Sequence, residues 1–343
     1  MTLVKFLFCI ILSLVFSKDL ASKTAESEEV AMATMSPTGS PSRFVYDQLQ
    51  KNIVRDTKGT FHIRPFFNGE LGPEESYFGA MRRGRIQLAA VSGQGIGTVI
   101  PEYAILRAPY LFHSFDELAF VYDALLTDLI SDLFAKKGML HLQWAANGWE
   151  NLYSQDPLLT PDDAKGYRIR VPLEPNAALF FGAIGADVIQ IPFTDIIPSL
   201  QTGLINGGES TSLMYVQAYL YNEAPHLTRT RHGFSFAVYA ANKKWFQKLP
   251  LETAQVFRSA YMKPRDAFDI LSRQTDKQLT LLQRAGLKVH DLSANQRELW
   301  QTTTNTAVYQ ILEQIGGQAQ ELYDLILEGK QAYVRNGEAL INP

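Results

Sequence analysis

Two arginines stand two positions apart in an apolar segment, at Arg168 and Arg170. The isoleucine between them and the Val-Pro that follows predict a short strand that ends before Pro172. A planar guanidinium can hold a carboxylate through two parallel hydrogen bonds, and it keeps its charge when it loses water. Arg170 is therefore the first candidate to bind an anionic ligand, with a surface arginine as the alternative. We expect Arg168, at the start of the strand, to be solvated.

The sequence around these arginines, residues 162–210, alternates helical and strand patterns with glycine and proline at the joints. Such alternation favours an α/β layer with a parallel sheet. Ligands of such sheets lie at the carboxyl ends of the strands, near the point where the strand order reverses. The expected anion site is therefore the strand end that carries Arg170.

Several blocks of this stretch, in order and at matching spacing, resemble the signature of the DctP-type solute receptors of TRAP transporters. The blocks are Asp163-Ala-Lys-Gly-Tyr-Arg-Ile-Arg-Val-Pro, Ile184-Gly-Ala, Pro192-Phe-Thr-Asp and Leu200-Gln-Thr-Gly-Leu-Ile-Asn-Gly-Gly-Glu. The resemblance implies an α/β, periplasmic-binding-protein-like (type II) fold with two interwoven domains and a long domain-spanning helix. It also implies that Arg170 pairs with the carboxylate of the ligand and that Phe193 lies against the ligand.

The length and composition suit such a protein. A chain of 343 residues with 46% hydrophobic and 20% charged residues is typical of a soluble two-domain protein. The expected domains are residues 28–146 with 234–275, and residues 147–233 with 276–343. The long helical pattern over 251–285 is the expected domain-spanning helix, with a kink or break at Pro264. A net charge of −3 gives no basic surface for nucleic acid.

Residues 1–17 carry Lys5 and then an apolar run over 6–16. The run is too short to span a bilayer comfortably and is typical of a secretory signal peptide, with approximate bounds 1–20. A buried strand or an uncleaved anchor is the alternative. The single cysteine, Cys9, lies in this run, so the mature chain would contain no thiol. We therefore expect a periplasmic protein.

Two further segments bear on the site. Residues 147–154 are expected to form a loop at the cleft between the domains. The segment Gly93-Gln-Gly-Ile-Gly follows a predicted strand at 87–92, as a phosphate-binding loop would. It lacks the third glycine of a dinucleotide fingerprint, because Thr98 stands there, and it leads into Pro101 rather than a helix. We therefore expect no cofactor there.

The chain departs from the family's well-known sialate receptors at several positions of the ligand site. Met35 stands in place of an asparagine, and Val91 followed by Ser92 in place of a glutamate. Glu150 stands in place of an arginine, and Ser210 in place of an asparagine.

These changes, with Trp149 added, suggest a cleft that has lost hydrogen-bonding groups. A sugar acid would leave its hydroxyl groups unpaired in such a cleft, so we expect a carboxylate with an apolar or aromatic body, or a lipid-like molecule. Alternatively, Met35 and Val91 are ordinary core residues. Glu150 could also receive a cationic group of the ligand.

The sequence offers little for catalysis. The six histidines show no metal-ligand spacing, and Gly208-Glu-Ser-Thr-Ser does not fit a nucleophile elbow. We expect Asp162 and Asp163 to cap a helix. A hydrolase that uses Glu150 or Glu209 remains the third interpretation, and we expect no catalytic residue, metal or cofactor.

The function expected first is an extracytoplasmic receptor that hands a small organic ligand to the membrane permease subunits of a TRAP-type transporter. The alternative is a receptor-fold carrier of lipid or another hydrophobic ligand that works with a helical-repeat (TPR-like) partner protein. An exposed apolar patch beside the cleft would favour that alternative.

Overall fold

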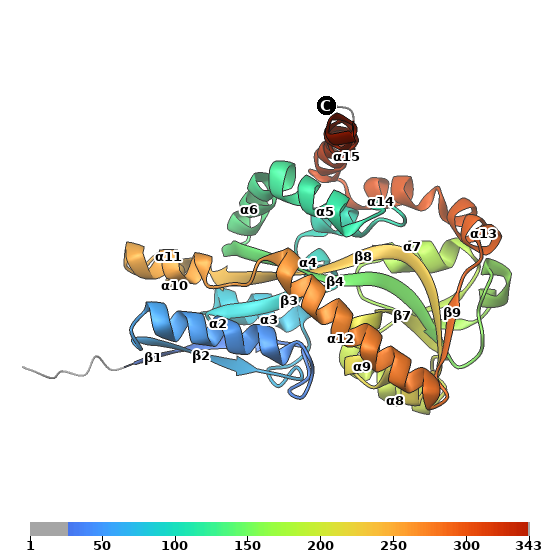
Figure 1. The fold of residues 1–343 in the computed structure, drawn as a ribbon, viewed down its shortest axis with the longest axis horizontal. Coiled ribbons are helices and arrows are strands. Elements are labelled where there is room, and N and C mark those ends of the chain that lie inside the picture. The colour runs from blue at the N-terminus through green and yellow to red at the C-terminus, as the bar shows by residue number, and fades with distance from the viewer. Residues whose placement is uncertain (1–26, 342–343) are drawn as a thin grey trace, which may run out of the picture.

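The computed structural model describes residues 27–341 (Figure 1). The expected signal peptide, residues 1–20, lies outside the described residues. The strands are β1 (Glu28–Thr34), β2 (Phe61–Phe66), β3 (Leu88–Ser92), β4 (Met139–Ser154), β5 (Arg168–Val171), β6 (Asp187–Gln190), β7 (Gly207–Thr211), β8 (His226–Asn242) and β9 (Lys288–Asp291).

These strands form one sheet in the order β2-β1-β3-β8-β4-β7-β5-β6, with β9 paired to β8. β1 pairs in parallel with β2 and β3, and we call the part of the molecule built on these strands the first lobe. β5 pairs in parallel with β6 and β7, and these strands build the second lobe. The long antiparallel strands β4 and β8 run through both lobes and join them (Figure 1).

The segment 147–154, expected as a loop, is the second half of β4. Asn147 and Gly148 suggested a turn, but the strand absorbs them at a register shift between Ala146 and Gly148. Gly148 has a φ of +106°, which a residue with a Cβ rarely adopts. Because β7 and β8 supply hydrogen-bond partners on both sides, the strand continues through a sequence that looked like a turn.

Helices cover both faces of the sheet (Figure 1). They are α2 (Arg43–Asp56), α3 (Glu75–Arg82), α4 (Gly93–Gly97), η1 (Pro101–Arg107), α5 (Phe115–Val121), η2 (Tyr122–Leu126), α6 (Thr127–Lys136), η3 (Pro161–Ala164), α7 (Pro175–Ala183), η4 (Phe193–Asp195), α8 (Ile196–Gln201), α9 (Ser212–Gln217), η5 (Leu220–Asn222), α10 (Lys243–Phe246), α11 (Leu251–Ser259), α12 (Pro264–Arg284), α13 (Ala294–Thr304), α14 (Ala307–Ile315) and α15 (Ala319–Ile341). The glycine-rich segment after β3 is thus the short helix α4, not a loop.

Helix α12 crosses from the first lobe to α9 of the second lobe (Figure 1). Pro264 lies in its first turn, where the missing N–H costs nothing, so the predicted break falls between α11 and α12. Its buried residues, Ala267, Leu271, Thr275 and Leu279, recur every four positions and form one face against β4 and α9.

Helix α15 packs against α5, η1 and η2. Leu322 and Ile326 belong to the hydrophobic core of the first lobe. The sequence analysis places residues 276–343 in the second domain, whereas the packing places α15 with the first lobe.

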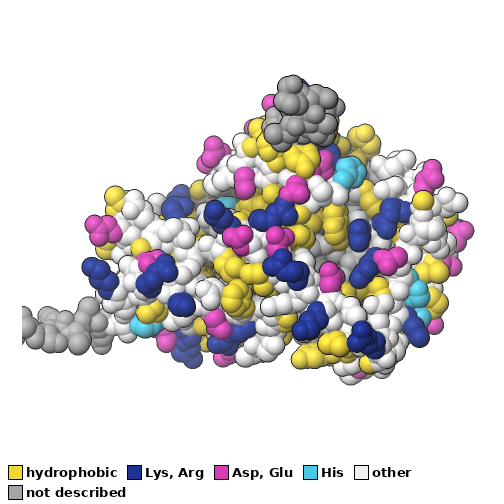
Figure 2. All heavy atoms as spheres, viewed as in Figure 1, with side chains coloured by type: hydrophobic (Ala, Val, Ile, Leu, Met, Phe, Trp, Pro, Cys, Tyr) yellow, Lys and Arg dark blue, Asp and Glu magenta, His cyan; other side chains and the backbone are white. Residues whose placement is uncertain are grey.

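The surface of the described residues that is visible in Figure 2 has no large region of a single charge. Acidic and basic side chains are interspersed over the face shown in Figure 2. Among residues 27–341, no helix combines the length and the apolar character needed to cross a membrane.

Close packing of strands explains why the first glycine of the Leu-Ile-Asn-Gly-Gly-Glu block, Gly207, has no side chain. A Cβ at Gly207 would lie 2.5 Å from the carbonyl oxygen of Tyr153 on β4.

We predict that Gly207→Ala lowers the free energy of unfolding by about 1–3 kcal/mol, because the strand backbones must move apart. Urea unfolding followed by circular dichroism measures it. Gly182→Ala is the control, since nothing lies within 4 Å of a Cβ there. Equal effects of the two substitutions would contradict this explanation.

Candidate ligand-binding site

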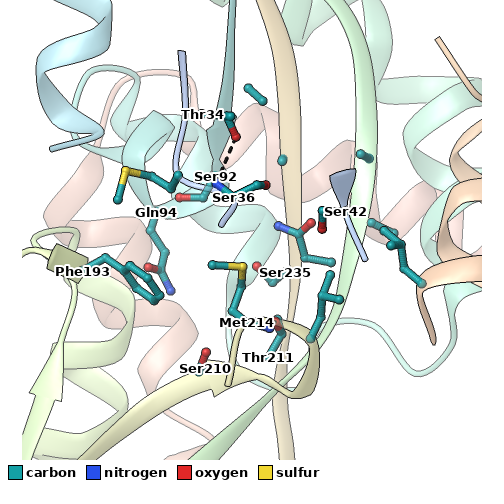
Figure 3. A pocket seen from close by; sticks show the side chains of 18 of the residues that line it. Thr34, Ser36, Ser42, Ser92, Gln94, Phe193, Ser210, Thr211, Met214 and Ser235 are labelled. Carbon is teal, nitrogen blue, oxygen red and sulfur yellow. Dashed lines mark hydrogen bonds between the residues drawn. The ribbon is translucent and has the colours of Figure 1, made fainter. Parts of the chain in front are cut away.

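A cavity of about 110 Å³ lies between the lobes, at the carboxyl ends of their parallel strands. Figure 3 shows side chains of both lobes around it: Thr34, Ser36 and Ser92 from the first lobe, and Ser210, Thr211 and Met214 from the second. Because both lobes contribute to the lining, the site is complete only when they lie together.

Arg170 lies at the end of β5 and lines this cavity, although its side chain is only 2% exposed. Its Nε donates to the carbonyl oxygen of Ile191 at 3.0 Å. No carboxylate of the described residues lies within 4.0 Å of the guanidinium. Burial lowers the pKa of Arg170, but an arginine remains charged at neutral pH. The cavity therefore contains a cation that makes no ion pair with the residues that the structure describes. Arg168 is exposed, as expected.

Five other predicted site residues also line the cavity: Met35, Ser92, Glu150, Phe193 and Ser210. Phe193, in η4, and Met35, after β1, are partly buried and share with Arg170 a narrow recess at the edge of the cavity. Ser210 is buried on β7. Ser92 lines the cavity as well, but its backbone N–H and its hydroxyl both donate to Glu74.

Two predicted site residues lie elsewhere. Val91 is fully buried in the core of the first lobe, so the alternative interpretation of Val91 as an ordinary core residue holds and its place in the cavity is wrong. Successive strand residues point to opposite faces, and the cavity face of β3 carries Ala90 and Ser92 instead. Trp149 packs edge-on against Phe234 and lines a neighbouring cavity under α12.

Behind the cavity, Arg107 of η1 holds three carboxylates. Its guanidinium donates to Glu174, to Glu209 at 3.1 Å and to Glu150 at 3.3 Å, and all four side chains are buried. Glu209 also accepts from Nε2 of His232 at 2.9 Å. Hydrogen bonding to His232 and the charge of Arg107 lower the pKa of Glu209 against the effect of burial. This cluster joins the first lobe to the second.

Glu150 and Glu74 bring negative charge to the cavity lining. Burial and the neighbouring charge of Glu209 raise the pKa of Glu150 to about 7. Glu74, just before α3, accepts from Ser92, and burial raises its pKa to about 7 as well. A glutamate that does not come from the end of the third strand, Glu74, therefore lines this cavity next to Ser92.

Glu74 and Arg107 also belong to the site, although the sequence did not identify them as candidates. A weak signal existed for Arg107, a lone charge inside the apolar run 103–112. Nothing local distinguishes Glu74 from Glu75. Within residues 27–341, no group of three histidine or acidic side chains could hold a metal ion.

The family model described as "Bacterial extracellular solute-binding protein, family 7" (DctP) matches residues 32–314. The chain belongs to this family. The predicted resemblance to DctP-type receptors is therefore confirmed, and the members of this family are solute-binding receptors rather than enzymes.

Similar proteins agree with this membership. A solute-binding protein of Verminephrobacter eiseniae is 29% identical over 62% of this chain and 64% of its own. The C4-dicarboxylate-binding periplasmic protein DctP of Vibrio cholerae is 26% identical over 76% and 79%. The sugar acid binding protein DctPAm of Advenella mimigardefordensis, solved with galactonate, has a TM-score of 0.82 at 24% identity and covers 89% of this chain and 99% of that one. This likeness confirms the two-domain type II fold.

The raised pKa of Glu74 predicts how stability depends on pH. Between about pH 4.5 and 7 the folded protein holds a proton on Glu74 that the unfolded chain releases, so this contribution to stability is lost as the pH rises through that window. We predict that Glu74→Gln loses less stability than the unmodified protein between pH 5 and pH 8. Calorimetric melting temperatures at both pH values test this.

Glu252→Gln, which removes an exposed carboxylate, is the control for the loss of one charge. If Glu74→Gln and the unmodified protein lost equal stability between the two pH values, the protonation assigned to Glu74 would be wrong.

Proposed function

We propose that the protein is the periplasmic receptor of a TRAP-type secondary transporter and binds a small organic carboxylate between its lobes. The observation that carries the proposal is the buried guanidinium of Arg170, which lines the cavity without a carboxylate partner among the described residues. A carboxylate fits this fork with two hydrogen bonds. The name of the Vibrio cholerae relative, a C4-dicarboxylate-binding protein, supports a carboxylate.

The side chains that line the cavity indicate the chemical character of the ligand beyond its carboxylate. Met35, Phe193, Leu213 and Met214 offer apolar contacts, as an apolar or aromatic body requires. Hydroxyl and amide groups line the cavity too, so it is less apolar than the sequence analysis expected; they include Thr34, Ser36, Ser42, Gln94, Thr211 and Ser235. We therefore favour a small acid that combines an apolar part with hydrogen-bonding groups (Figure 3).

The size of the cavity favours a small ligand over a lipid. A cavity of about 150 Å³ in another protein admits benzene, and this cavity is of similar size, about 110 Å³. No observation favours the hydrophobic-ligand carrier or its helical-repeat partner. The proposed partners are the membrane permease subunits of the transporter.

We further propose that the receptor does no chemistry and works by closing on its ligand. β4 and β8 join the lobes and carry register shifts near their middle, where a hinge can form. On the other side of the cavity, Ser42 of the first lobe and Gln217 of α9 exchange hydrogen bonds of 3.2 and 3.0 Å. A ligand that contacts both lobes therefore favours the closed state.

Arg170→Gln tests the function directly. We predict that it weakens the binding of small carboxylic acids by about 30-fold or more, since breaking a buried charge pair costs about 2–5 kcal/mol. Isothermal titration calorimetry with C4 to C6 carboxylic acids, and with their uncharged primary amides, measures this. The acids bind the unmodified protein and the amides do not.

Arg168→Gln is the matched control, because this exposed arginine lies two residues earlier on the same strand. Binding that survives Arg170→Gln, or that is lost equally in both variants, would refute the assigned role of Arg170.

A further inference from the structure

Arg170 and Glu150 differ in the part of the cavity that they line. Arg170 lines a narrow recess together with Phe193, Met35 and the carboxylates of Glu74 and Glu75. Glu150 lines the main cavity but not this recess. It stands in the middle of the sheet, opposite Thr211 of β7 on one side and Gly233 of β8 on the other. A ligand whose carboxylate meets Arg170 therefore extends toward a wall that contains a carboxylate.

Glu150 differs from the other acidic residues of the lining by having an unused acceptor. Its Oε1 accepts from Arg107 at 3.3 Å, whereas its buried Oε2 has no hydrogen-bond partner among the described residues. The Ser235 hydroxyl, which lines the same cavity, is near enough to lower the pKa of Glu150, but its geometry in this structure does not make a hydrogen bond with Oε2. Both oxygens of Glu209 have donors, and both oxygens of Glu74 accept from Ser92. Buried polar atoms are nearly always paired, so an unpaired one at a binding site indicates a missing partner.

The charges around the cavity favour a positively polarised partner. The cavity lining, its recess and the cluster behind it contain two guanidiniums, those of Arg107 and Arg170, and five carboxylates: Glu74, Glu75, Glu150, Glu174 and Glu209. Two positive against five negative groups leave an excess of three negative charges when every carboxylate is ionised and His232 is neutral. A second carboxylate on the ligand would add to this excess.

We propose that Glu150 accepts a hydrogen bond from the end of the ligand opposite its carboxylate, so that the receptor takes a monocarboxylate with an ammonium or hydroxyl group there and rejects a dicarboxylate. This inference rests on the proposed function, because it needs the carboxylate at Arg170. An ammonium group gains most, since its hydrogen bond is charge-assisted and it offsets the negative excess. A second carboxylate offers no donor and meets like charge.

Two matched series of acids test the inference, one with four carbons and one with six. Within each series only the terminal carbon differs: methyl (butyrate, hexanoate), hydroxymethyl (4-hydroxybutyrate, 6-hydroxyhexanoate), aminomethyl (4-aminobutyrate, 6-aminohexanoate) or carboxylate (succinate, adipate). Titration calorimetry is done at pH 8, because burial and the charge of Glu209 raise the pKa of Glu150 to about 7 and a protonated Glu150 could donate to a carboxylate.

In at least one series, we expect the amino acid to bind at least tenfold more tightly than the dicarboxylate, with the hydroxy acid between them. Glu150→Gln brings the ratio of these two dissociation constants close to one. Glu174→Gln is the matched control: it removes another carboxylate from Arg107, but Glu174 does not line the cavity. We expect Glu174→Gln to keep the ratio of the unmodified protein, so a change confined to Glu150→Gln reports contact with the ligand and not disturbance of Arg107.

The titrations distinguish a failure of this inference from a failure of the proposed function. A preference for the dicarboxylate or for the methyl-terminated acid, or a ratio that Glu150→Gln leaves unchanged, overturns this inference while Arg170-dependent binding of acids still supports the proposed function. If the unmodified protein binds none of the eight acids, both proposals fail, because all eight carry the carboxylate that Arg170 is proposed to hold.

Discussion

A buried guanidinium that has no carboxylate partner among residues 27–341 is the constraint on which the rest of this structure depends. Removing a charge from water costs several kcal/mol unless another charge compensates it. Arg107 and Arg170 are both buried, but Arg107 is surrounded by three carboxylates, whereas among residues 27–341 Arg170 has only the carbonyl oxygen of Ile191 as a hydrogen-bond partner. Arg107 thus joins the lobes, while Arg170 is the group that we propose binds the ligand. Under this proposal the carboxylate of the ligand compensates the desolvation of Arg170.

The architecture places this guanidinium where the lobes meet. Parallel strands of the first lobe and of the second end at the same cavity, and β4 and β8 carry one continuous sheet across it. The close approach of β4 and β7, which excludes a Cβ at Gly207, keeps β5 and its arginine next to the centre of the sheet. Hydrogen bonds between Ser42 and Gln217 close the other side. The charge is therefore enclosed by elements from both lobes.

The sequence predicted the features that depend on local pattern or on a contiguous motif. The strand of Arg170 and the break at Pro264 follow from apolar runs and proline positions. Val91 was misplaced because a shift of one residue along a strand exchanges the core face for the cavity face. The second half of β4 was missed because its partners, β7 and β8, lie far away in the sequence. Glu74 and Arg107 were missed because their roles arise only when distant segments pack together.

The most direct test of the central claim is a crystal structure of the protein purified with the ligand that it retains. The account predicts a small molecule between the lobes, with two carboxylate oxygens about 2.7–2.9 Å from the guanidinium nitrogens of Arg170. A ligand bound away from Arg170, a ligand without an anionic group at that position, or an Arg170 side chain turned toward bulk water would contradict it.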